Sequence, residues 1–154
     1  MAYILGILAT ETSTTDDHGL GAIGQNVTSA GIKKFKWIKY DTGGGSVAAV
    51  ADQVAYYYTL DGYKNHTVTS DLSDSIEIGA GVLQSAPGDG EYAWIQISGP
   101  ATLNLALTAG ADGDPLTPTG SSDGTLDVSA AVTDNVCAIA GDISDKEVVC
   151  MFPE

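Results

Sequence analysis

The chain has 154 residues, a length that suits one domain with its own hydrophobic core, and its 19 glycines favour short strands joined by turns. It carries 20 acidic residues against six basic ones, for a formal net charge of −14, and every basic residue is a lysine. Because arginine makes the bidentate phosphate contacts of nucleic-acid binding, this composition argues against a nucleic-acid partner, and the charge argues against a membrane partner with an anionic surface.

The first 30 residues show no sustained helical or strand period and are predicted to form an extended N-terminal arm. We expect this arm to become ordered by contact with another molecule, where its apolar side chains can add a strand to the edge of a partner's sheet. These side chains are Ile4, Leu5, Ile7 and Leu8.

Residues 31–154 are predicted to form one β domain, whose first strand runs from Ile32 to Tyr40. Four of the six lysines lie on this strand: Lys33, Lys34, Lys36 and Lys39. Two interpretations stay open. The lysines protect a solvated edge strand, or they and Trp37 contact a capsid or the acidic face of a neighbouring copy.

The middle of the chain is predicted to consist of short strands separated by Gly, Asp and Pro turns. These strands are Tyr56–Leu60, Tyr63–Thr69, Ile76–Gln84, Tyr92–Ile97, Thr102–Thr108 and Thr125–Val128. Asp61-Gly62 is a turn dipeptide of the hairpin kind, and Gly79 and Gly81 indicate a bulge or a close backbone approach. Residues 47–55 fit either a helical turn or a strand.

The last hairpin is the best-defined element, with strands at Asn135–Ala140 and Glu147–Phe152. Symmetric pairing would place Cys137 opposite Cys150. The two cysteines are then buried neighbours or a cross-strand disulfide, and we expect buried free thiols because free cysteine is among the most buried residue types. With about nine or ten short strands in all, the chain is predicted to be an all-β sandwich or small barrel.

Enzyme chemistry finds little support in the sequence. His18 and His66 lie 48 positions apart in polar segments, and no zinc-ligand, nucleophile-elbow or phosphate-loop motif occurs. Asp112-Gly113-Asp114 resembles a calcium turn but lacks the further oxygen ligands of an EF-hand. We therefore expect no catalytic residues, no metal site and no cofactor. A cleft with perturbed carboxylates would revive the enzyme hypothesis.

The run Gly90–Ala101, which reads Gly-Glu-Tyr-Ala-Trp-Ile-Gln-Ile-Ser-Gly-Pro-Ala, resembles a signature of tailed-phage capsid decoration proteins, also called cement or head-stabilising proteins. In that family an aromatic-x-Trp-hydrophobic-Gln strand ends in a glycine turn. A Gly-Asp-Pro-Leu-like turn, an Asp-Gly turn and a closing hairpin follow it. Their counterparts here are Gly113–Leu116, Asp123-Gly124 and residues 137–152, so the resemblance covers roughly residues 31–154.

The resemblance implies a small β-barrel or β-tulip-like single domain, which in this family is often a trimer. Such a protein is a viral structural protein of the virion. It would bind the major capsid protein on the outer surface of an expanded icosahedral bacteriophage head and stabilise that head. The alternative is a glycan-binding or adhesive module of a virion fibre or surface protein, in which exposed aromatic residues such as Trp37 and Tyr56–Tyr58 stack on sugars.

Overall fold

The fold is given by a computed structural model, which describes residues 3–59 and 62–154. Strands dominate it, and five of them close into a mixed β-barrel to which further strands are attached, so the predicted all-β barrel class is confirmed. Neither helical segment in the described part of the chain has the length and hydropathy to cross a membrane.

The described residues contain twelve strands, one helical turn and one 3-10 turn. The strands are β1 (Tyr3–Leu5), β2 (Thr12–Ser13), β3 (Ile23–Thr28), β4 (Gly31–Tyr40), β5 (Val54–Tyr58), β6 (Thr67–Thr69), β7 (Ser75–Leu83), β8 (Tyr92–Thr102), β9 (Pro115–Thr117), β10 (Asp127–Val128), β11 (Ala138–Asp142) and β12 (Glu147–Met151). The helical segments are α1 (Gly62–Asn65) and the 3-10 turn η1 (Leu72–Asp74).

The barrel consists of β4, β6, β5, β7 and β8 in that order, and β8 closes it by pairing with β4. Only the β4–β6 contact is parallel within this ring. Apolar side chains on the inner faces, such as Tyr40, Leu83 and Ile95, are fully buried and form part of the main core. The strand alternation read from the sequence therefore corresponds to barrel inside and barrel outside.

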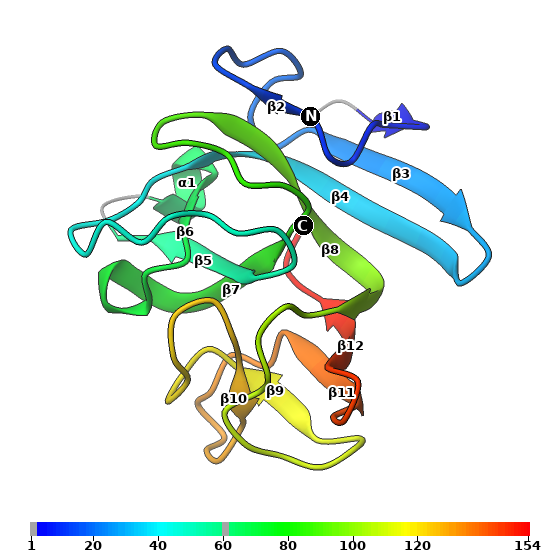
Figure 1. Ribbon diagram of the computed structural model, residues 1–154, viewed down its shortest axis with the longest axis vertical. Coiled ribbons are helices and arrows are strands. Elements are labelled where there is room, and N and C mark those ends of the chain that lie inside the picture. Colours follow the sequence, from blue (N-terminus) through cyan, green and yellow to red (C-terminus); the bar gives the residue numbers. More distant parts are fainter. Residues whose placement is uncertain (1–2, 60–61) are drawn as a thin grey trace.

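Strands β9 to β12 form a second small sheet that continues from β8 through β12 (Figure 1). The predicted final hairpin is confirmed as β11 and β12, but its register is displaced by one residue. Ala138, not Cys137, lies opposite Cys150, and the register shifts once more between Ala140 and Asp142, next to the loop. Both cysteines are free and buried, as expected.

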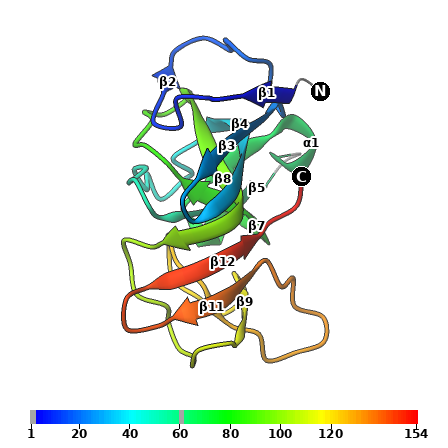
Figure 2. The same ribbon diagram turned by 90° about the vertical axis from the view of Figure 1, so that its right-hand side faces the viewer.

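The N-terminal segment lies against the barrel, where we had expected an extended arm ordered by another molecule. Its strand β1 pairs with β3, β2 pairs with β8, and β3 pairs with β4 from Ile23↔Lys36 to Thr28↔Gly31. Three levels result, with β1 and β2 above, the barrel in the middle and β9 to β12 below (Figures 1 and 2). A backbone hydrogen bond links the N-terminal segment to the barrel, because the carbonyl of Ala22 accepts from the N–H of Trp37 on β4.

Three middle elements differ from the prediction. Residues 103–108 form no strand, because the chain leaves β8 after Thr102 and Leu103 N–H bonds to Lys146 in the loop between β11 and β12. Residues 47–53 form a loop before β5. The expected return strand Tyr63–Thr69 is α1 followed by the short β6, and of the expected Asp61-Gly62 turn, Asp61 lies outside the described residues.

Candidate docking surface

The four lysines of β4 do not form one face. Lys36 is only 1% exposed, and its Nζ donates hydrogen bonds to Tyr57 Oη at 2.8 Å and to the carbonyl of Pro153 at 3.0 Å. Strand alternation explains this position, since Lys36 shares the inner face of β4 with Ile38. The hypothesis that Lys36 contacts a partner is therefore wrong for this fold.

The other three lysines of β4 are half-buried and lie in three different surroundings. Lys34 forms an ion pair with Glu154, with 2.6 Å between Nζ and Oε1. Lys33 lines a hollow of about 350 Å³ together with Glu147, and Lys39 lines another beside α1. A single lysine-covered face that meets an acidic partner does not exist on this strand.

Trp37 is completely buried, so the prediction that it contacts a partner or stacks on a sugar is also wrong. It points away from the main core into a second cluster, where its ring centroid lies 5.1 Å from that of Trp94 and 4.7 Å from that of His18. Its indole N–H donates to Asp16 Oδ1 at 3.0 Å. Tyr56 and Tyr57 are buried in the main core, so they offer no sugar platform either.

The N-terminal segment covers this second cluster. Ile4 and Ile7 pack against it, and Glu11 closes its polar side by accepting from Trp94 Nε1 at 3.4 Å and contacting His18 Nε2 at 2.9 Å. Trp37 and Trp94 lie opposite each other on the outer faces of β4 and β8, and two such large apolar rings need a cover to keep them from water. Of the four apolar residues proposed for docking, two are thus used inside the protein.

The other two, Leu5 and Leu8, are 75% and 68% exposed. Leu5 lies opposite Gln25 on β3, and two residues further along β3 the exposed Val27 lies opposite the exposed Ile32 of β4. Because paired residues and residues two apart share a face, Leu5, Val27 and Ile32 lie on one face of the sheet, which they share with Gln25 and Lys34, and we call this surface the hairpin face. The sequence did not single out Val27 and Ile32.

The hairpin face lies at the end of the sheet. Strand β1 ends the order of strands, and the β3–β4 hairpin projects from the barrel (Figure 1). Val27 is 80% exposed and Ile32 is 53% exposed, which is unusual for adjacent large apolar side chains. A sheet edge next to an exposed apolar face is suited to a protein partner.

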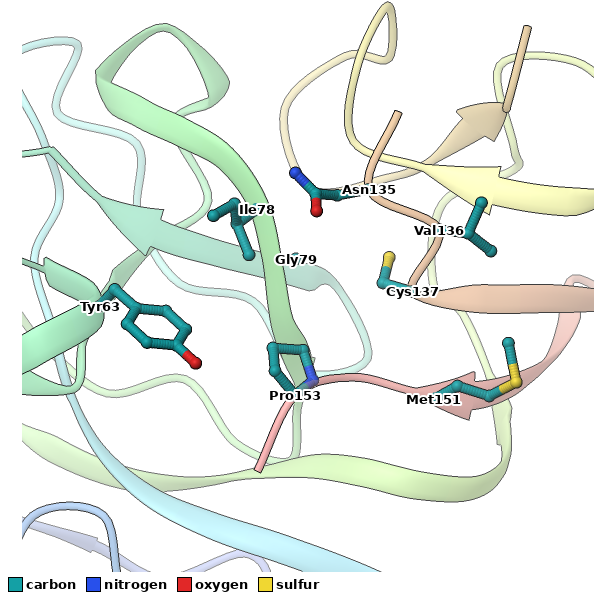
Figure 3. A pocket seen from close by; sticks show the side chains of 8 residues that line it. All are labelled: Tyr63, Ile78, Gly79, Asn135, Val136, Cys137, Met151 and Pro153. Carbon is teal, nitrogen blue, oxygen red and sulfur yellow. The ribbon is translucent and has the colours of Figure 1, made fainter. Parts of the chain in front are cut away.

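A separate pocket of about 340 Å³ lies between the barrel and the second sheet (Figure 3). Tyr63 and Ile78 line one side, and Val136, Cys137 and Met151 line the other. Burial raises the pKa of the Cys137 thiol far above its ordinary value, with a smaller contribution from Cys150. The thiol therefore stays protonated, and the pocket offers apolar contact and no activated nucleophile.

Among the described residues, no group of three His, Cys, Asp or Glu side chains lies close enough together to hold a metal ion. No protein-family model, no curated protein and no solved structure matches this chain.

Proposed function

We propose that this chain is a viral structural protein, namely a capsid decoration protein that binds the outer surface of an expanded icosahedral head and stabilises it. The observation that carries the proposal is the hairpin face, with Leu5, Val27 and Ile32 exposed at the end of a sheet that belongs to a closed barrel. The decoration-like sequence Gly90–Ala101 supports it, because this run forms most of β8.

The physical logic is that of a rigid adaptor. A closed barrel has few free edges, so contact with a partner is concentrated where strands extend beyond it. Burying the three apolar side chains against the major capsid protein removes them from water. The net charge of −14 keeps free copies apart in solution until they dock.

A homotrimer suits this role, since three linked hairpin faces bind one lattice with an avidity that a single small apolar contact lacks. The proposed partners are therefore the major capsid protein and further copies of the chain, on the outer surface of the virion. The glycan-binding alternative is weaker, because three of its four aromatic residues, Trp37, Tyr56 and Tyr57, are buried, and Tyr58 is only partly exposed.

The test is co-sedimentation of the purified protein with expanded, undecorated capsids of the source virus. We expect saturable binding at a fixed ratio per capsid subunit. Replacing Leu5 and Val27 by lysine should weaken binding at least tenfold, since two charges would have to be buried in an apolar contact. The matched control replaces Val132 and Val136, which are exposed near β11, by lysine.

Both double variants add the same charge at exposed positions, so both should fold and should have similar unfolding curves. Equal binding by the two variants would show that the hairpin face is not the docking surface. An absence of saturable binding by the folded wild-type protein would overturn the proposed function itself.

A further inference from the structure

A hollow of about 510 Å³ lies on the outer face of the barrel, and none of its lining residues belongs to the hairpin face or to the apolar pocket. Three neighbouring strands contribute one residue each to it. Lys39 of β4 lies beside Thr67 of β6 on one side and beside Tyr92 of β8 on the other. These three side chains therefore share a face of the sheet and form one row along the hollow.

The walls of the hollow come from two loops. Lys64, Asn65 and His66 contribute from α1 and the residue after it, and Leu20 contributes from the N-terminal segment. His66 has a positive φ of 52°, which is uncommon for a residue with a side chain. Its ring packs so closely on Gly21, which has a φ of +84°, that an added Cβ there would lie 2.6 Å from His66 Nε2.

Tyr92, at the β8 end of the row, is also held in place by a packing contact. The ring of Tyr92 stacks on that of Trp37, with 6.3 Å between the centroids and 13° between the planes. Trp37 is in turn buried in the second cluster. Packing thus holds His66 and Tyr92 in place at two sides of the hollow, whereas Lys64 and Asn65 are exposed at its rim.

The charge of the hollow is opposite to that of the chain. Its lining contains two lysines and no carboxylate, although the chain has 20 acidic residues and only six lysines. Within the described residues, neither Lys39 nor Lys64 has a salt bridge or side-chain hydrogen bond. The two ammonium groups therefore give the lining a net positive charge, and the carboxylate of Asp16, which accepts a hydrogen bond from the Leu20 N–H at 3.1 Å, lies behind the lining at that side.

We propose that this hollow binds a small oxyanion, meaning the carboxylate or phosphate group of a polar molecule. Lys39 and Lys64 supply the positive charge, and Asn65, Thr67 and Tyr92 supply neutral polar groups around it. A ligand that carries a sugar or another apolar face also finds Leu20 and the Tyr92 ring in the lining. This site is independent of capsid docking and stands whether or not the proposed function is correct.

The experiment is a titration of the isotope-labelled protein with inorganic phosphate, glucuronate and neutral glucose, followed by amide NMR shifts at constant ionic strength. We expect saturable shifts at residues 64–67 and at Tyr92 with phosphate, with glucuronate or with both. Whichever of the two anions binds with the higher affinity shows whether the hollow prefers a phosphate or a carboxylate. Glucose should bind at least tenfold more weakly, because it has no negative charge to pair with the two ammonium groups.

Lys39→Gln and Lys64→Gln should each weaken anion binding about tenfold, as expected for a lost charge-assisted hydrogen bond. Lys33→Gln is the matched control, since it removes the same charge from the same strand outside the hollow. It should change the affinity less than twofold. Equal losses in all three variants, equal binding of glucose, or no saturable shift with either anion would overturn the proposal.

Discussion

Lys36 places an ammonium group within the barrel wall, and this position makes a quantitative prediction about stability. Burial lowers the pKa of Lys36 from 10.5 to about 8, and the carboxylate of Glu154 opposes this change only in part. In the unfolded chain the same group titrates near its ordinary pKa of about 10.4. Between these two values the unfolded chain binds more protons, so the contribution of Lys36 to the free energy of unfolding rises with pH.

Replacing Lys36 by methionine isolates this contribution. A pKa change from 10.5 to about 8 corresponds to about 3.4 kcal/mol, of which the range from pH 7 to pH 10 covers about 2.5 kcal/mol. Solvent near Glu154 screens part of this cost. We therefore expect the free energy of unfolding of the wild type to rise by about 1 to 2.5 kcal/mol relative to Lys36→Met over that range.

The prediction is stated as a difference between the wild type and Lys36→Met because other buried groups make the free energy of unfolding fall as the pH rises. Burial raises the pKa of Cys137, Cys150 and Tyr56, so these groups keep their protons in the folded protein and lower its stability at alkaline pH. Both proteins share them, so the difference cancels their effect.

Urea unfolding under reducing conditions, followed by tryptophan fluorescence at pH 7, 8, 9 and 10, measures the difference. Lys64→Met, at an exposed position of α1, controls for the loss of one positive charge. A difference between the wild type and Lys36→Met that stays constant from pH 7 to pH 10 would refute the reasoning.

Because Ile7 packs against the second cluster, Ile7→Ala should lower the free energy of unfolding, measured in urea, by about 1 to 3 kcal/mol. Leu8→Ala, at the exposed neighbouring position, should change it by less than about 0.5 kcal/mol, and equal effects of the two substitutions would contradict the packing. Gly79→Ala should cost about 1 to 3 kcal/mol in the same assay, because the added Cβ would lie 2.7 Å from Cys137 Sγ, and an unchanged midpoint would show that the site can relax. Cys137 and Cys150, each 2% exposed, should react with a thiol reagent only as fast as the protein unfolds, and rapid labelling of the native protein would disprove their burial.

Local patterns in the sequence predicted most of the strands. The run from Ile32 to Tyr40 became β4, and Tyr92–Ile97 became the first part of β8, because both are rich in aromatic and β-branched residues. The last hairpin was also found, but with a register displaced by one residue, since the register depends on the geometry of the loop, which the apolar pattern of the two strands does not show.

The docking residues were harder to predict because their exposure depends on contacts between distant segments. Trp37 is buried only since residues 4–22 fold back over the outside of the barrel. Lys36 follows the strand alternation to the inside, although its charge suggested solvent. Val27 and Ile32 became notable only once their pairing placed two large exposed side chains beside Leu5.

The alternation over residues 102–108 was misleading for a related reason. Leu103 is buried, but Leu105 is 37% exposed, so the apolar pattern there does not mark one face of a strand. The segment Gly62–Asn65 carried no signal for a helical turn, because four residues are too few to show a helical period.

The closure of the barrel by β4 and β8 has a consequence for how the chain is made in the cell. Roughly 50 residues separate the end of β4 from the start of β8, and a ribosome adds about 5 to 20 residues per second. During synthesis the inner side chains of β4, Ile38 and Tyr40 among them, therefore stay exposed for about 3 to 10 s until the strand that closes the ring has been made. The first half of the nascent chain is thus a natural client for a chaperone, and slowing translation between residues 41 and 91 should increase its aggregation.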